Sequence, residues 1–120
     1  MKTHKDLKVW QKSINFVTKI YKKTNSFPNS ELYGLTSQLR RAAVSVPPNI
    51  AEGADRNTDK EYVRFFFIAR ASAAEIETQL IIAENLGYIA SINNQLKEEL
   101  LEISKMLTAL IYKIKQRIVK

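Results

Sequence analysis

The 120-residue sequence contains no cysteine and only three glycines, three prolines and one histidine. The absence of cysteine excludes disulfides, thiol catalysis and cysteine-based zinc sites. An all-β fold needs many turns, so the scarcity of glycine and proline argues against that class. We therefore expect one helical domain that spans residues 1–120.

Groups that carry catalysis are also scarce. The only histidine, His4, lies near the N-terminus, in a segment expected to fray, so a histidine-based triad has no partners. The sequence has no glycine-rich phosphate loop and no Glu-x-x-His pair of the di-iron bundles. Glu75 and Glu77 are two positions apart and would lie on different faces of a helix. We expect no enzymatic activity, no metal and no cofactor.

Long apolar runs are missing as well. No stretch approaches the roughly 18 residues that a membrane-spanning helix needs, and the N-terminal segment lacks the apolar core of a signal peptide. The expected protein is soluble and cytoplasmic, without a membrane partner.

Apolar residues recur instead at helical spacing, in four segments. Short connections make successive helices antiparallel, so the sequence predicts an all-α, up-down-up-down four-helix bundle. The expected helices span approximately residues 6–25, 31–53, 58–87 and 93–118.

Each predicted helix has one apolar stripe as its candidate buried face. In the first helix these residues are Leu7, Trp10, Ile14, Val17 and Tyr21. In the second they are Leu32, Leu35, Leu39, Ala42 or Ala43, Val46 and Ile50. In the third they are Tyr62, Phe66, Ala69, Ala73, Ile76, Leu80 and Ala83. In the fourth they are Leu96, Leu100, Ile103, Leu107, Leu110, Ile114 and Ile118.

The helix ends have recognisable signals. Asp6 is expected to cap the first helix, and Asn29 or Ser30 the second. Thr58 and Glu61 are spaced as a capping box before the third helix. That helix should end at Gly87, and a further cap is expected within residues 91–94.

Pro47 and Pro48 interrupt the second helical segment. The apolar stripe nevertheless keeps its phase from Leu39 through Val46 to Ile50. This continuity favours a kink within one helix, with hydrogen bonds lost locally. A short break is the alternative, because Pro48 disfavours helical geometry at Pro47.

The first and third helices have more apolar surface than a monomeric bundle needs. Large apolar patches seldom stay exposed, so the sequence predicts a homo-oligomer. The alternative is a thick core with scattered apolar residues on the surface. The candidate interface residues lie beside the predicted stripes and are Phe16, Ile20, Val63, Phe67, Ile81 and Ile82.

The charge is strongly basic, with a formal net charge of +7. For a small domain this balance favours an anionic partner, of which nucleic acid is the commonest. A solvated lysine face is the alternative for the first helix, and stabilisation of helix C-termini is the alternative for late cations. The candidate phosphate-binding residues are Lys8, Lys12, Lys19, Lys23, Arg40, Arg41, Arg56, Lys113, Lys115 and Arg117.

Arg40 and Arg41 have two interpretations. Repeated around an oligomer, they would form a cationic surface for phosphates. Alternatively, they pair with Glu52 or Asp55 and fix the helix junction. We favour the structural interpretation, because these acids are close in sequence.

Four segments carry a family resemblance: DLKVWQKS, YGLTSQLRRAAVSVPPNIAEGADR, EYVRFFFIARASAAEIETQL and ISKMLTALI. Together they resemble the four-helix-bundle proteins encoded within intervening sequences of bacterial 23S ribosomal RNA genes. These proteins are also similar to the accessory variability protein of diversity-generating retroelements. The resemblance implies a homopentamer, and its retroelement branch implies a basic central channel and a nucleic-acid partner. It supplies no catalytic residues.

The resulting hypothesis is a non-catalytic basic oligomer that binds RNA or DNA without sequence preference. The alternative is a protein-interaction scaffold whose basic face recognises an acidic polypeptide.

Overall fold

The computed structural model describes residues 3–90 and 95–118, which form four long α-helices, two short 3-10 helices and no strand. The long helices are α1 (Lys8–Thr24), α2 (Leu35–Ala54), α3 (Asp59–Asn85) and α4 (Gln95–Ile118). The short helices η1 (His4–Asp6) and η2 (Asn29–Glu31) precede α1 and α2. The chain is therefore all-α over these residues, as predicted.

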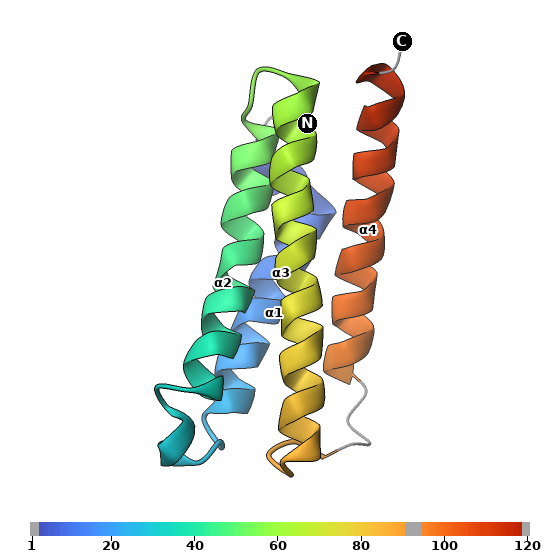
Figure 1. Cartoon of the computed structure of the whole chain (residues 1–120). Coiled ribbons are helices and arrows are strands. Elements are labelled where there is room, and N and C mark those ends of the chain that lie inside the picture. The colour runs from blue at the N-terminus through green and yellow to red at the C-terminus, as the bar shows by residue number, and fades with distance from the viewer. Residues whose placement is uncertain (1–2, 91–94, 119–120) are drawn as a thin grey trace.

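The four long helices lie side by side, each antiparallel to the one before it (Figure 1). The molecule measures 50 × 21 × 21 Å. α1 and α3 each pack against α2 and α4, so α1 and α3 are diagonally opposite. We call the end that holds the α2–α3 turn the α2–α3 end; α1 begins and α4 ends there (Figure 1). The opposite end is the α1–α2 end.

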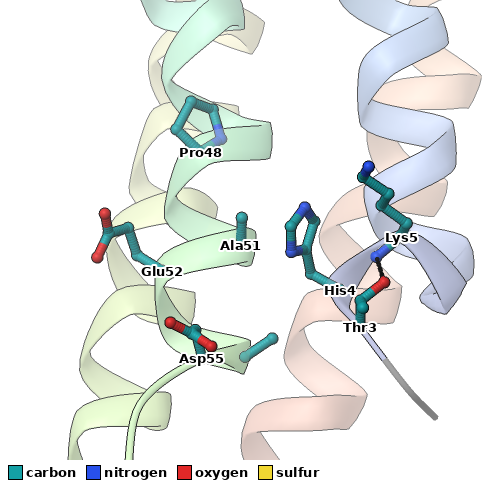
Figure 2. A pocket seen from close by; sticks show the side chains of 8 residues that line it. Thr3, His4, Lys5, Pro48, Ala51, Glu52 and Asp55 are labelled. Carbon is teal, nitrogen blue, oxygen red and sulfur yellow. Dashed lines mark hydrogen bonds between the residues drawn. The ribbon is translucent and has the colours of Figure 1, made fainter.

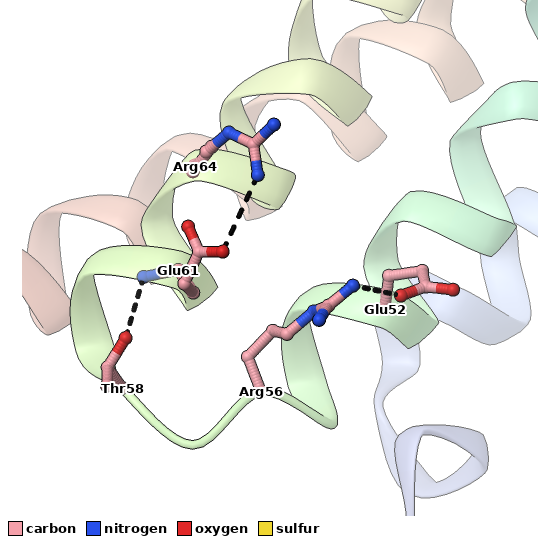
Figure 3. Close-up of polar contacts among 5 residues, drawn as sticks. All are labelled: Glu52, Arg56, Thr58, Glu61 and Arg64. Carbon is pink, nitrogen blue, oxygen red and sulfur yellow. Dashed lines mark hydrogen bonds and ion pairs between the residues drawn. The ribbon is translucent and has the colours of Figure 1, made fainter.

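The start of α3 agrees with its sequence signal. The Thr58 hydroxyl oxygen accepts a hydrogen bond from the Glu61 amide at 3.2 Å (Figure 3). The Glu61 carboxylate, expected to bond the Thr58 amide in return, lies 3.5 Å from Nη1 of Arg64. The cap is thus confirmed on the threonine side, while the glutamate is used for an ion pair within the first turns of α3.

The end of α3 is a left-handed glycine cap. Gly87 has a φ of +79°, which L side chains rarely adopt. The Gly87 amide donates to the Glu84 carbonyl at 3.0 Å, and the Tyr88 amide donates to the Ala83 carbonyl at 2.9 Å. This pair of bonds is a Schellman motif, and it confirms Gly87 as the stop signal.

The predicted cap of α1 is wrong. Leu7 is the N-cap of α1, and its side chain makes no capping hydrogen bond. Asp6 belongs to η1, where its carboxylate accepts from the Thr3 amide at 3.2 Å. The capping signal at Asp6 therefore belongs to η1, the shorter helix just before α1.

The predicted cap of α2 is also wrong. Asn29 lies within η2, and α2 begins only at Leu35. The Glu31 carboxylate accepts from the Leu35 amide through Oε1 at 3.1 Å. The expected cap within residues 91–94 lies outside the described residues.

The buried face of α1 is not the predicted stripe. Ile14 and Tyr21, expected in the core, are 39% and 41% exposed. The face that is buried contains two polar residues, and its members are Val9, Ser13, Phe16, Ile20 and Thr24. The polar pair is compatible with the core because the Ser13 and Thr24 hydroxyls donate to backbone carbonyls of α1 at 2.7 and 2.8 Å.

The stripes of the other three helices are largely confirmed. The α2 stripe is buried from Leu35 onward, whereas Leu32 precedes the helix and is 47% exposed. The α3 stripe is buried except for half-buried Tyr62. In α4 the stripe is buried except for half-buried Leu110 and exposed Ile118, and Ile111 joins the core.

The α2 helix continues through the two prolines. Residues on both sides of Pro47 and Pro48 remain helical, so the short break is excluded. Pro47 is buried and Pro48 is exposed. The Asn49 amide group donates to the Ser45 carbonyl at 2.7 Å, which adds a hydrogen bond beside the prolines. The kink itself stays a prediction.

Three of the six predicted interface residues belong to the core of the single chain. Phe16, Ile20 and Val63 are only 3%, 0% and 7% exposed. The first two were misplaced because the buried face of α1 was misassigned, and the third faces inward beside Phe66. Ile81 and Ile82 are exposed and remain available to a partner.

Candidate nucleic-acid interface

The lysines of α1 are not free of acidic neighbours. Lys12 Nζ lies 2.9 Å from Oε1 of Glu102, and Lys19 forms an ion pair with Glu99. Both glutamates come from α4, which packs beside α1. The sequence correctly showed a polar face of α1 without acids, but the fold brings acids to it from another helix. Half of the predicted lysine stripe is therefore neutralised.

Arg40 has a structural role at the end of α1. Its guanidinium donates to the Thr24 hydroxyl at 2.9 Å, to the Asn25 side-chain oxygen at 3.1 Å and to the Tyr21 carbonyl at 3.4 Å. It also lies 4.7 Å from the centre of the Tyr21 ring. A cation at a helix C-terminus is stabilising. These contacts favour the structural interpretation of Arg40, but the predicted acidic partners, Glu52 or Asp55, were wrong.

Arg41 differs from its neighbour. It is exposed and lines a shallow groove of about 460 Å³ together with Tyr33 and Val44. Tyr33 is 94% exposed and Val44 is 41% exposed. This groove lies at the α1–α2 end and combines two cations, Arg40 and Arg41, with an apolar surface.

Arg56 is neutralised within the α2–α3 turn. Its Nη2 lies 2.7 Å from Oε2 of Glu52 (Figure 3). The guanidinium is also 4.6 Å from the centre of the Phe65 ring, and Arg64 is 5.1 Å from the same ring. Glu52, expected near Arg40 or Arg41, is thus the partner of Arg56 instead.

The C-terminal cations of α4 differ from one another. Arg117 Nη1 lies 3.8 Å from Oδ1 of Asp59, and Lys113 is exposed without an ion pair among the described residues. Lys115 Nζ lies 4.9 Å from the centre of the Phe67 ring. Phe67, predicted at the oligomer interface, is half-buried, and its ring is occupied by this contact and a second cation.

That second cation is Arg70, which the sequence analysis did not select. Its guanidinium carbon lies 4.6 Å from the centre of the Phe67 ring, and its Nη1 donates to the Thr108 hydroxyl at 3.2 Å. The available signal was the i, i+3 spacing of Phe67 and Arg70, which places both on one helix face.

Four exposed lysines gather at the α2–α3 end without an ion pair in the described part of the chain. We call Lys5, Lys8, Lys60 and Lys113 the end cluster. They lie in η1, at the start of α1, in the first turn of α3 and in the last two turns of α4, and the long axis of the molecule measures 50 Å. Charges act together over a screening length of about 8–10 Å in physiological salt. The end cluster is therefore separate from Lys22, Lys23 and Arg41 at the other end.

A pocket of about 630 Å³ lies beside the end cluster, between η1 and α2 (Figure 2). His4 and Lys5 line one wall, and Glu52 and Asp55 line the other. His4, expected in a fraying segment, lies in η1, and its ring packs edge-on against Trp10 at 5.2 Å. Lys5 belongs to both the end cluster and this lining, which also contains the two acids.

Two further kinds of feature, metal sites and membrane-spanning helices, were sought among the described residues. Residues 3–90 and 95–118 contain no group of three metal-ligating side chains suitably placed to bind an ion. Over the same ranges, no helix combines the length and the apolar character needed to cross a bilayer.

Two tyrosines have shifted pKa values. A hydrogen bond to the Glu31 carboxylate raises the pKa of Tyr88. Burial raises the pKa of Tyr62, partly opposed by the positive charge of Arg117. Both shifts move ionisation further from neutral pH, so both phenols remain neutral where binding would be measured.

Most of the chain is similar to a known protein family. The family model described as 23S rRNA-intervening sequence protein matches residues 5–109. This range includes α1, α2, α3 and α4 as far as residue 109, so Lys113, Lys115 and Arg117 lie outside it. No curated protein matches the chain.

Proposed function

Because the chain belongs to the 23S rRNA-intervening sequence protein family, we propose that it is a non-catalytic homo-oligomer that binds RNA or DNA without sequence preference. The observation that carries the proposal is the end cluster of unpaired lysines. Lysine ammonium groups bind phosphates as point charges, and phosphate contacts provide affinity without sequence readout. The formal net charge of +7 favours the same ligand class.

The proposed oligomer would repeat the end cluster once per subunit. Ile81 and Ile82 support it, because they are 45% and 43% exposed on the outer side of α3. Leu86, at the end of the same helix, is 53% exposed. A pentamer and a relation to the retroelement accessory protein are implied by the family resemblance, and a cytoplasmic location is the expectation from the sequence. All three are part of the proposal.

The test is fluorescence anisotropy of a labelled structured RNA, titrated with protein over a range of salt concentrations. Binding should weaken steeply as salt rises, with a slope that reports the number of phosphates contacted. The variant K8Q/K113Q removes two unpaired lysines and should lower the magnitude of the slope by roughly 1 to 2.

The matched control is K12Q/K19Q, which removes the same charge from lysines already paired with Glu102 and Glu99. It should change RNA binding less than K8Q/K113Q does. Absence of binding by the wild-type protein at low salt would refute the proposal. A larger effect of K12Q/K19Q would place the binding surface at Lys12 and Lys19 instead.

A second candidate function is a protein-interaction scaffold that recognises an acidic polypeptide. The observation in its favour is the groove of Arg41, Tyr33 and Val44, where Arg40 is held by the end of α1. An apolar surface beside an exposed arginine is more typical of a protein interface than of a phosphate site. Pull-down from the host after nuclease treatment distinguishes the two functions. A partner that is retained without nucleic acid, and lost with R41E, would favour the scaffold.

A further inference from the structure

Two cations from different helices share the ring of Phe67. Arg70 of α3 and Lys115 of α4 lie 4.6 and 4.9 Å from its centre. An aromatic face attracts each cation, but two like charges beside one ring also repel each other. The arrangement is therefore one that a bound anion would stabilise.

No carboxylate in the described part of the chain neutralises this pair. Within residues 3–90 and 95–118, neither Arg70 nor Lys115 forms an ion pair, whereas Arg56, Arg64 and Arg117 each do. The positions three and four residues before and after Arg70 and Lys115 hold no acid either. Helical neighbours at these spacings are the ones within the same helix that could reach the two cations.

Thr108 holds the guanidinium of Arg70 in place. Its hydroxyl accepts from Nη1 at 3.2 Å, and this is the one hydrogen bond of the Arg70 side chain among the described residues. An arginine has five N–H donors in a planar fork, which suits the oxygens of a phosphate. Arg70 is thus oriented while most of its donors stay available.

We propose that Arg70 and Lys115 form a phosphate-binding site at the α3–α4 surface. The ligand is a phosphate group, supplied either by the backbone of a nucleic acid or by free phosphate. Arg70 donates to its oxygens through the fork, and Lys115 contributes a second positive charge. The inference deepens the proposed function and depends on it only where RNA is the source of the phosphate.

The RNA arm uses anisotropy with two variants of the site. R70Q/K115Q should weaken RNA binding by roughly tenfold and lower the magnitude of the salt slope by about 1 to 2. R70K keeps the charge but loses the fork, so it should still weaken binding by about threefold. The control K22Q/R41Q removes the same charge from the opposite end and should have a smaller effect. Circular dichroism verifies that each variant is folded.

The free-phosphate arm uses backbone-amide NMR of the full chain titrated with sodium phosphate, with sodium chloride holding the ionic strength constant. The signals of Phe67, Arg70 and Thr108 should shift saturably, and the shifts should disappear in R70Q/K115Q. Saturable shifts without RNA binding by the wild-type protein would support the site with free phosphate as its ligand and refute the proposed function.

RNA binding unchanged in both variants, together with no saturable shift, would overturn the site while leaving the proposed function intact. Failure of the wild-type protein to bind either RNA or phosphate would overturn both. A third outcome would also overturn the site. If R70K binds RNA like the wild-type protein, and K22Q/R41Q loses as much affinity as R70Q/K115Q, binding depends only on general positive charge.

Discussion

At the scale of single residues, Glu31 shows how one side chain joins two segments far apart in sequence. Its Oε1 accepts from the Leu35 amide at 3.1 Å, and its Oε2 accepts from the Tyr88 hydroxyl at 2.9 Å. The first bond satisfies a backbone donor at the start of α2. The second ties that start to the turn after α3, so the carboxylate stabilises the α1–α2 end of the bundle.

Replacing Glu31 should therefore change the titration of Tyr88. The bond to the carboxylate favours the protonated phenol and raises its pKa above the usual 10.0. A group with a raised pKa in the folded state contributes stability that is present below pH 10 and lost as pH rises through the folded pKa. E31Q should lower the pKa of Tyr88, measured by near-ultraviolet absorbance titration.

Assignment of this titration step needs a second variant, because burial also raises the pKa of Tyr62. Y88F should remove the step that E31Q shifts. An identical titration curve for E31Q and the wild-type protein would show that the bond to Glu31 has no effect on Tyr88.

Gly53 is required by close packing between α2 and α3. A Cβ atom at this position would lie 2.7 Å from Cδ1 and 2.9 Å from Cε1 of Phe66, which is fully buried. G53A should lower the free energy of unfolding by about 1–3 kcal/mol, the usual cost of overpacking. Urea unfolding measures this change.

Phe66→Leu is the matched test of that explanation. Because leucine leaves room for the added methyl group, G53A should be less destabilising in the F66L background than alone. Strict additivity of the two substitutions would show that the cost of G53A arises elsewhere, for example in the helix end.

At the scale of helices, the sequence predicted three buried faces but misassigned that of α1. The predicted stripe of α1 is wholly apolar, whereas the true buried face includes Ser13 and Thr24. Hydroxyls that bond carbonyls of their own helix can be buried at little cost. A pattern of apolar residues cannot identify such positions, and it therefore favoured the stripe with more apolar members.

The candidate site was less predictable than the fold for a related reason. Helical spacing placed Lys12 and Lys19 on one face, but it could not show that Glu99 and Glu102 of α4 lie against them. Which cations are unpaired depends on the register between helices that are distant in sequence. The end cluster is thus a property of packing.

Arg40 and Arg41 provide a direct test of structural against surface roles at the α1–α2 junction. R40A removes three hydrogen bonds to the end of α1 and should lower the free energy of unfolding by about 1–3 kcal/mol. R41A removes an exposed side chain and should change stability by less than about 0.5 kcal/mol. Thermal and urea unfolding measure both, and equal effects would contradict the assignment of the cap to Arg40.

At the scale of the whole molecule, exposed apolar residues lie on different sides of the bundle. Ile14 and Tyr21 are exposed on α1, and Ile81 and Ile82 are exposed on α3, which is diagonally opposite. Two unlike surfaces on one subunit suit a heterologous contact, in which one surface meets the other on the next copy. Such contacts form rings when the rotation closes, which is compatible with the proposed cyclic homo-oligomer.

The variant I81D/I82D tests this arrangement. The native protein should have a mass that is a multiple of 13.8 kDa. The interface would bury the two aspartates of the variant, and because unpaired charges are costly to bury, the measured mass should shift toward that of the monomer. Sedimentation equilibrium measures the mass. The control L101D/Y112D changes two apolar residues of α4 that are 51% and 67% exposed, and it should leave the mass unchanged. A monomeric native protein would refute the oligomer, and dissociation by the control alone would move the interface to α4.

Because an oligomer repeats the end cluster, dissociation by I81D/I82D should also weaken binding to a long RNA more than to a short one, through lost multivalency.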